Sequence, residues 1–158
     1  MARRIDYYDD PAGPRANSMV PSVNVVVTSE NDEILLIRRS DNDNWAIPGG
    51  AIDLGESMTQ AAIRETKEES GIDCEITGLV GIYTDPKHVI LYTSNGEARQ
   101  EFSIVLTGRP VGGELTPSSE SSEVRWVPAS EIDGYAMDHS MRIRIRHYLE
   151  NQGSPVLK

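Results

Sequence analysis

The stretch from Gly50 to Ile72 constrains this chain more than any other, because it carries the start signal, the body and the stop signal of one helix. Ser57 followed by Gln60 fits a capping box, which predicts that the helix begins near Met58. Gly71 is placed to end the helix in the left-handed conformation. A glycine-rich loop precedes the helix, so its first residues can approach other groups closely.

Three glutamates of the predicted helix share one face. Taking Met58 as zero, Glu68, Glu65 and Glu69 fall at roughly 280°, 340° and 20° around an ideal helix. Carboxylates three and four positions apart repel one another, and Arg64 offsets only part of that repulsion. This geometry alone leaves two readings open, which are a solvated acidic face and a cation site.

A hard divalent cation would make the carboxylate cluster favourable. Mg²⁺ takes oxygen ligands from a few carboxylates and completes its shell with water and substrate phosphates. Gly49 and Gly50 lie just before the helix, so a main-chain carbonyl of either can reach the same ion. Such a site would bridge phosphate oxygens and neutralise the charge that develops on them.

Composition bounds the class of protein. The 158 residues fit one domain with one substantial core. There are 25 acidic and 15 basic residues, and a net charge of −10 disfavours polymeric DNA or RNA as a partner. Cys74 is the only cysteine, so no intrachain disulfide is expected and a reducing, cytoplasmic location is favoured. The apolar runs are too short to span a membrane, and the N-terminus lacks the apolar run of a signal peptide.

Patterns along the rest of the chain predict a mixed sheet between helices, which is an α/β fold. Residues 1–21 form either a loose arm or a segment docked on the body or on a second subunit, so a homodimer is one alternative. Residues 22–150 form the domain, and residues 151–158 form a frayed tail. Strands are expected at 22–28 and 34–39 as a hairpin, at 89–93 and 100–107 around a hairpin turn at Asn95-Gly96, and at 45–47, 74–84 and 124–127. A loop is expected over 108–122 and a closing helix over 140–150, with Arg142, Arg144 and Arg146 in solvent.

The central stretch resembles the signature box of the Nudix hydrolases. That box is Gly, five residues, Glu, seven residues, Arg-Glu, an apolar residue, any residue, Glu-Glu, any residue, Gly and an apolar residue. The matching positions are Gly50, Glu56, Arg64-Glu65, Glu68-Glu69, Gly71 and Ile72, with Thr66 as the one departure, at an apolar position. The segments 45–49 and 124–127 are also typical of the family, so the resemblance covers roughly residues 22–150.

The resemblance implies a fold, a reaction and a set of roles. The fold would be an α/β/α sandwich with a mixed β-sheet. The reaction would be Mg²⁺- or Mn²⁺-dependent hydrolysis of a nucleoside diphosphate linked to a further moiety. Glu65, Glu68 and Glu69 would bind the metal together with a carbonyl of Gly49 or Gly50, and Glu56 would pair with Arg64. A late acidic residue would add a ligand or base, and the candidates are Glu123, which is preferred, and Glu120.

Substrate preference has weaker signals. Pro86 lies 14 positions after Ile72 (86 − 72) and resembles the downstream proline of ADP-ribose pyrophosphatases. Arg38 and Arg39 follow a strand and are candidates to contact phosphates, and His88 is a candidate base or substrate contact. The expected substrate is ADP-ribose or a similar nucleotide sugar. The alternatives are a pool-cleaning nucleoside triphosphate pyrophosphohydrolase and a non-catalytic nucleotide sensor.

Overall fold

Strands and helices are interleaved along the chain, as expected for the α/β class. The structure is a computed structural model that describes residues 3–151 and 153–158. In chain order its elements are β1 (Arg4–Tyr8), β2 (Ser18–Met19), β3 (Ser22–Val27), β4 (Glu33–Arg39), β5 (Trp45–Ala46), β6 (Gly49–Ala51), α1 (Met58–Ser70), β7 (Ile72–Tyr83), β8 (His88–Tyr92), β9 (Glu97–Gln100), β10 (Ser103–Gly113), β11 (Ser121–Pro128), the 3₁₀ helix η1 (Ala129–Gly134), α2 (His139–Glu150) and β12 (Val156–Leu157).

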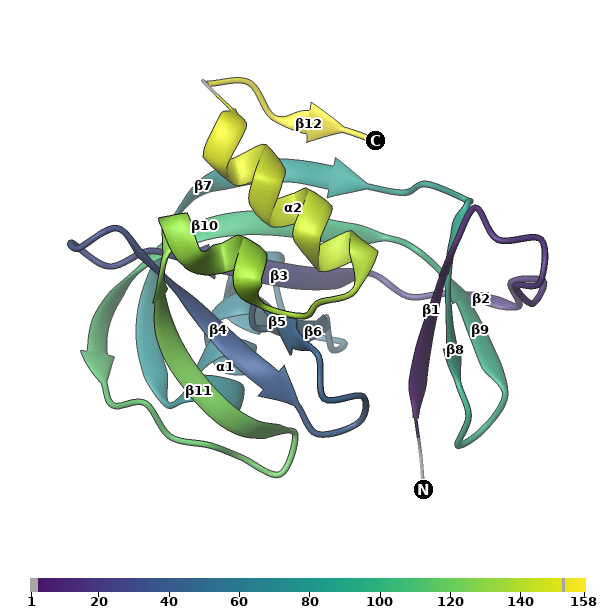
Figure 1. Cartoon of the computed structure of the whole chain (residues 1–158), viewed down its shortest axis with the longest axis horizontal. Helices are drawn as coiled ribbons and strands as arrows, with labels where there is room; N and C mark the ends of the chain where they lie inside the picture. The colour runs from purple at the N-terminus through teal and green to yellow at the C-terminus, as the bar shows by residue number, and fades with distance from the viewer. Residues whose placement is uncertain (1–2, 152) are drawn as a thin grey trace.

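Three sheets form the body of the molecule (Figure 1). The five-stranded sheet has the order β12-β7-β10-β3-β6, the four-stranded sheet has the order β1-β8-β9-β2, and the three-stranded sheet has the order β11-β4-β5. Strand β10 runs parallel to β3 and antiparallel to β7, so the largest sheet is mixed. The predicted α/β fold with a mixed sheet is therefore confirmed.

The two helices cover opposite faces of β3. Side chains alternate between the two faces of a strand. Val25 packs in one buried cluster with Ala61 and Ala62 of α1, whereas Val26 packs in another cluster with Ile145 of α2. Both valines are fully buried. This alternation places β3 in the middle layer of a helix–sheet–helix sandwich, as the family resemblance implies.

The predicted hairpin between residues 22–28 and 34–39 is wrong. Strand β3 pairs with β10 and β6, while β4 pairs with β11 and β5 in another sheet. Only the bridge between Thr28 and Ile34 joins the two strands. Because β10 and β6 occupy both edges of β3, no edge is left for β4. The short connection between them therefore carries the chain from one sheet to the next.

Strand β8 pairs with β9 around the turn at Asn95-Gly96, and this hairpin matches the prediction there. Gly96 has a positive φ of 73°, which a side chain would disfavour. The strand predicted over 100–107 is instead split, because β9 ends at Gln100 and β10 begins at Ser103 in a different sheet. Strand β10 continues to Gly113, inside the segment predicted as a loop.

Both ends of the described chain pair with the body. Strand β1 pairs antiparallel with β8 of the same chain, so residues 4–8 are docked rather than loose. Strand β12 pairs parallel with β7, so Val156 and Leu157 are held and the predicted frayed tail is wrong there. Met1, Ala2 and Gln152 lie outside the described residues.

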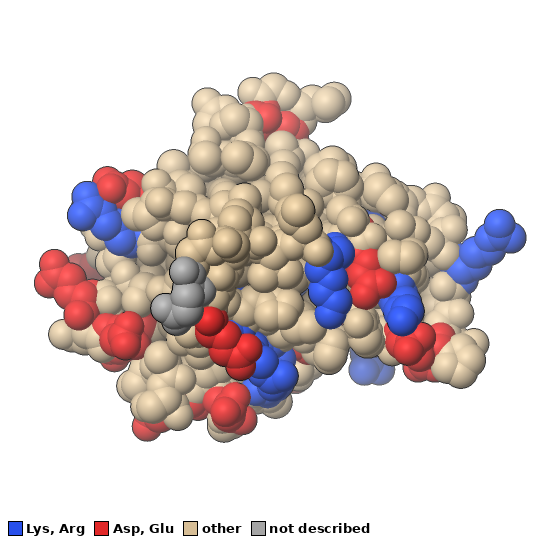
Figure 2. Space-filling model, turned by 90° about the horizontal axis from the view of Figure 1, so that it is seen from above, with Lys and Arg blue, Asp and Glu red and all other residues tan. Residues whose placement is uncertain are grey.

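Charged side chains of both signs lie next to one another on the molecular surface. Figure 2 shows that, on the face bearing α2 and β12, basic side chains lie beside acidic ones instead of forming a basic area. Within the part of the chain that the structure describes, no helix is long and apolar enough to cross a lipid bilayer.

Candidate active site

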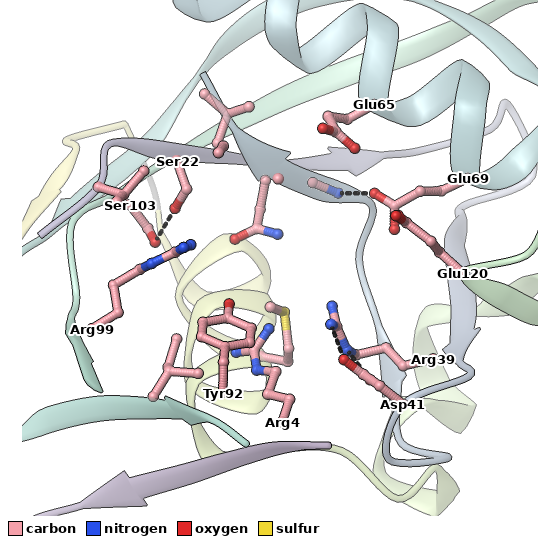
Figure 3. A pocket seen from close by; sticks show the side chains of 18 of the residues that line it. Arg4, Ser22, Arg39, Asp41, Glu65, Glu69, Tyr92, Arg99, Ser103 and Glu120 are labelled. Atoms are coloured by element: carbon pink, nitrogen blue, oxygen red, sulfur yellow. Dashed lines mark hydrogen bonds and ion pairs between the residues drawn. The ribbon is translucent and has the colours of Figure 1, made fainter. Parts of the chain in front are cut away.

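A cavity of about 580 Å³ lies between the α1–β6 side of the molecule and the four-stranded sheet (Figure 3). Glutamates from α1 line one wall, and side chains of β1, β8 and β9 line the opposite wall. The cavity therefore joins the signature stretch to strands that are distant in the sequence. The polar residues around it are Arg4, Ser22, Asn24, Arg39, Ser40, Asp41, Glu65, Glu69, Tyr92, Arg99, Glu101, Ser103, Ser119, Glu120 and Arg144.

Helix α1 begins and ends where the sequence predicts. The Ser57 Oγ accepts the Gln60 N–H at 3.1 Å, and the Gln60 Oε1 accepts the Ser57 N–H at 2.8 Å, which completes the capping box. Gly71 closes the helix with a φ of 81°. Ile63 is exposed. The buried face is made of small residues, namely Ala61, Ala62, Thr66 and Ser70.

Arg64 connects three glutamates of the signature stretch. Its guanidinium donates to both carboxylate oxygens of Glu56, at 2.7 and 2.8 Å. It also donates to Glu65 at 2.9 Å and to Glu68 at 3.3 Å. The hydrogen bonds from Arg64 lower the pKa of the Glu56 carboxyl to about 2. Because a guanidinium is a rigid planar fork, these contacts fix where the carboxylates lie.

Glu69 is the most deeply buried carboxyl of the signature stretch, with 3% of its surface exposed. Burial raises the pKa of Glu69 to about 8, and the nearby charge of Glu65 adds to this effect. The Gly49 N–H donates to Glu69 Oε1 at 3.0 Å and partly offsets the increase. Burial likewise raises the pKa of Glu65, although Arg64 opposes it. A cation bound in the cavity would stabilise the ionised forms of these two carboxyl groups.

The residues at this wall fit a divalent metal ion. Gly50 passes so close to Glu65 that an added Cβ would lie 2.5 Å from Glu65 Oε1, so a larger residue there would displace the Glu65 carboxylate. Glu65, Glu69 and the Gly49–Gly50 backbone line the same cavity. Mg²⁺ keeps several waters and binds substrate phosphates, so it needs only one or two protein carboxylates.

Glu68 does not line the cavity with the other two glutamates. Its side chain is 59% exposed and pairs with Arg64. Within residues 3–151 and 153–158, no group of three or more His, Cys, Asp and Glu side chains is gathered closely enough to hold a metal ion by itself. The cavity therefore offers a partial oxygen shell that water and substrate would complete.

Glu120 and Glu123 have different surroundings. Glu120 lines the cavity, and its charge contributes to the raised pKa values of Glu65 and Glu69. Figure 3 shows Glu120 beside Glu69. Glu123, the preferred candidate from the sequence, pairs with Arg38 at 2.9 Å and Arg125 at 2.8 Å instead. The structure therefore brings Glu120, rather than Glu123, to the carboxylate wall.

The two candidate arginines of β4 also diverge. Arg39 lines the cavity and is held by Asp41 through two bonds of 2.9 and 2.7 Å. Arg38 projects from the neighbouring position to Glu123, outside the cavity lining. Alternation along the strand explains the split. Of the pair, Arg39 is the one that lines the cavity.

Pro86 and His88 are not part of the cavity lining. Pro86 lines a separate hollow of about 330 Å³, together with Tyr7, Pro11 and Lys87. His88 is 2% exposed and hydrogen-bonds to Asp6 inside the protein. The structure therefore separates both residues from the carboxylate wall.

Sequence reasoning missed most of the opposite wall. Arg4, Tyr92 and Arg99 come from three strands of one sheet, and Arg99 lies over the Tyr92 ring at 4.8 Å. Alternation within these short strands was the available signal, since it places Arg4 and Tyr92 on one sheet face. Arg144, expected in solvent, is 2% exposed and lines the cavity. It lies on the buried face of α2, and its position depends on partners far away in the sequence.

Comparison with known proteins agrees with the fold. The NUDIX domain family matches residues 19–152. A MutT-like protein of Streptomyces ambofaciens is 33% identical over 135 residues, covering 85% of this chain and 80% of that protein. This fold and site define a hydrolase of phosphoric anhydride bonds. The chain belongs to the Nudix family.

Other relatives carry different activities in their names. A putative 8-oxo-dGTP diphosphatase of Bacillus subtilis is 29% identical, covering 75% of this chain and 72% of that protein. An ADP-ribose pyrophosphatase of Methanocaldococcus jannaschii is 30% identical, covering 75% and 68%. Among solved structures, a MutT protein from Methanosarcina mazei superposes with a TM-score of 0.68 at 26% identity, covering 87% and 98%.

Proposed function

We propose that this chain is a metal-dependent pyrophosphohydrolase that cleaves a nucleoside diphosphate linked to another moiety, with ADP-ribose or a nucleotide sugar preferred. The observation that carries the proposal is the single cavity that places Glu65 and Glu69 opposite Arg4, Tyr92 and Arg99. A diphosphate bound at the carboxylate wall would have its remaining groups directed to the wall across the cavity. That wall combines an aromatic ring with hydrogen-bonding groups, which suits a base or a sugar.

Charge balance in the cavity favours a diphosphate over a triphosphate. Each of the four arginines that line it already holds a carboxylate, in the pairs Arg4–Asp6, Arg39–Asp41, Arg99–Glu97 and Arg144–Glu101. An additional phosphate would need positive charge that these pairs have largely neutralised. Neutral sugar hydroxyls, in contrast, can bond to the carboxylates and to the Ser22 and Ser103 hydroxyls.

Glu65 and Glu69, with a carbonyl of Gly49 or Gly50, would hold Mg²⁺ or Mn²⁺, and Glu68 would join them from the solvent side. When bound, the metal supplies charge neutralisation on the phosphate oxygens and lowers the pKa of water. Arg64 and Glu56 keep the glutamates in position.

Glu120 is assigned the role of proton acceptor. Water adds to a phosphorus of the diphosphate, the bond from that phosphorus to the bridging oxygen breaks, and the proton of the water passes to a carboxylate. Glu120 lines the cavity beside Glu69 and is exposed, so it can accept that proton and release it to solvent. Glu123 is engaged with two arginines and is therefore a poorer acceptor.

A nucleoside triphosphate is the second candidate substrate. The observation that favours it is the B. subtilis relative whose name refers to 8-oxo-dGTP. A triphosphate would be cleaved at the same carboxylate wall, with pyrophosphate as a product. For either substrate the partner is a small nucleotide, and the single, buried Cys74 is consistent with a cytoplasmic location.

Product analysis across a substrate panel tests the proposal. The protein is incubated with Mg²⁺ and, separately, ADP-ribose, a UDP-sugar, a dinucleoside diphosphate and a nucleoside triphosphate. We expect AMP and ribose 5-phosphate from ADP-ribose, with a higher kcat/KM than for the triphosphate. Faster release of pyrophosphate from the triphosphate would select the second candidate. No turnover of any of them would contradict both.

A further inference from the structure

One face of the four-stranded sheet carries a chain of buried charges behind the cavity. Strand pairing places Tyr8 opposite His88 and Asp6 opposite Ile90, so even-numbered residues of both strands share a face. Asp6 and His88 therefore point to the same side, and His88 also meets Glu101 from the segment after β9. These groups are almost fully removed from solvent.

His88 lies between two carboxylates. Its Nε2 is 3.0 Å from Asp6 Oδ2, and its Nδ1 is 3.5 Å from Glu101 Oε1. The Nδ1 atom has no hydrogen-bond partner within the described structure, so its contact with Glu101 is that of an ion pair. Two carboxylates beside a buried histidine favour its protonated, positively charged form.

The same two carboxylates hold two arginines of the cavity wall. Asp6 accepts from Arg4 at 2.7 and 3.1 Å. Glu101 accepts from Arg144 at 2.6 Å, and a second nitrogen of Arg144 donates to Asn24 at 2.6 Å. Arg4 and Arg144 both line the cavity, whereas His88 does not. His88 thus connects one arginine of β1 to one arginine of α2.

The charges of this network leave an excess of positive charge beside the cavity. Arg4, Arg144 and protonated His88 carry three positive charges, and Asp6 and Glu101 carry two negative charges, so the sum is +1. With an uncharged His88 the net charge of the network would be zero. Because electrostatic attraction is strong in a low-dielectric cavity, an anionic substrate would bind more tightly to the network with the net positive charge.

We propose that His88 is a positioning residue that fixes Arg4 and Arg144 in the cavity wall, where they receive the nucleotide part of the substrate away from the scissile bond. The proposal rests on the proposed function, since it assigns the wall opposite the carboxylates to that substrate. It also gives strand β1 a functional role, although β1 lies outside the residues that the family matches.

A charged histidine would make substrate affinity depend on pH. Burial alone would lower the pKa of His88, but its contacts with Asp6 and Glu101 outweigh burial and raise that pKa. Affinity would therefore hold at low pH and weaken as pH rises through the raised pKa of His88. The other titratable or polar groups around the same small buried space are Tyr8, Tyr83, Asp85, His139, Ser140 and Lys158.

The test compares His88→Asn with the wild-type protein. ADP-ribose hydrolysis with Mg²⁺ gives KM and kcat, and calorimetry gives the affinity for AMP. We expect KM to rise by about 5- to 20-fold and AMP affinity to fall similarly, while kcat changes by less than about twofold. His139→Asn is the matched control, because His139 is another histidine near this face that, within the described structure, forms no hydrogen bond or ion pair with Asp6, Glu101, Arg4 or Arg144. Its KM should equal that of the wild type.

A second variant covers the case in which His88→Asn does not fold. Arg4→Lys keeps the positive charge but loses the pair of hydrogen bonds that Arg4 donates to Asp6. KM should therefore rise again, while kcat stays at the wild-type value. Wild-type KM and AMP affinity in the variant or variants that fold would overturn the proposal. If the wild type binds AMP better than the variants but does not cleave ADP-ribose, the proposed substrate fails and the role of His88 stands. If the wild type binds no AMP, the role of His88 fails as well.

Discussion

Glu120 and Glu123 lie three residues apart and differ in what they contact. Glu120 adjoins the buried carboxyls of Glu65 and Glu69, whereas Glu123 pairs with Arg38 and Arg125. Glu120 precedes β11, whereas Glu123 lies within β11. At Ser121–Glu123 the pairing of β11 with β4 shifts register, which sequence patterns do not reveal.

Replacing these two glutamates separately tests the assignment. Glu120→Gln should lower kcat on the order of 10²- to 10⁴-fold, because it removes the proposed proton acceptor. Glu123→Gln should change kcat by less than about twofold and serves as the matched control. The measurement is steady-state hydrolysis of ADP-ribose with saturating Mg²⁺. Equal losses in the two variants would contradict the role given to Glu120.

The positions of the signature stretch were predictable from the sequence because their geometry is local. Glu56, Arg64 and Glu65 lie within one loop and one helix, so spacing alone brings them together. Arg144 was predicted in solvent and is buried, because its partners Asn24 and Glu101 are 120 and 43 positions away. Contacts of that range depend on the packing of α2 against the sheets.

Helix α1 depends on the glycine that ends it. Gly71 has a φ of 81°, and an added Cβ there would lie 2.2 Å from the Glu114 carbonyl oxygen. Gly55 has a similar φ of 90°, but nothing lies within 4 Å of an added Cβ. The two glycines therefore share the conformational requirement and differ in the space around them.

Alanine substitutions separate these two effects. Gly55→Ala should lower the free energy of unfolding by about 1 kcal/mol, which is the strain of a left-handed alanine. Gly71→Ala should lower it by about 2–4 kcal/mol, because backbone atoms of the 114–116 segment must also move. Urea unfolding followed by circular dichroism measures both. A smaller loss for Gly71→Ala than for Gly55→Ala would show that the close contact is unimportant.

At the scale of elements, the sequence predicted the positions of strands better than it predicted which strands pair. The Asn95-Gly96 hairpin was predictable because its turn residues lie next to its strands. The pairing of β1 with β8 joins segments 84 positions apart (88 − 4), so the sequence left a loose arm and a docked arm as equal alternatives. Strands β3 and β4 are both buried and apolar, and such strands do not specify their neighbours by pattern.

At the scale of the whole molecule, the buried carboxyl of Glu69 links stability to pH and to metal. The pKa of Glu69 is raised from 4.5 to about 8, so the folded protein holds a proton that the unfolded chain releases. This contribution to stability is complete below pH 4.5 and is lost as pH rises through about 8. A metal bound to the carboxylate would take over the role of the proton.

Unfolding in urea at pH 6 and pH 8.5, with EDTA or with Mg²⁺, tests this linkage. In EDTA the wild type should lose more stability between the two pH values than Glu69→Gln, because glutamine does not ionise. Mg²⁺ should restore stability to the wild type at pH 8.5 and do less for the variant. If the wild type and Glu69→Gln lost the same stability between pH 6 and pH 8.5 in EDTA, the raised pKa of the buried Glu69 carboxyl would be contradicted.

The central claim is that the carboxylates of the cavity perform metal-dependent cleavage of a diphosphate. It is tested most directly by Mg²⁺-dependent conversion of ADP-ribose to AMP and ribose 5-phosphate, measured for the wild type, Glu69→Gln and the control Glu75→Gln. Glu75 is an exposed glutamate of β7 that pairs with Arg109. We predict turnover by the wild type and Glu75→Gln, and a loss of kcat on the order of 10²-fold or more in Glu69→Gln. Unchanged turnover in Glu69→Gln, or turnover by the wild type in EDTA, would contradict the account.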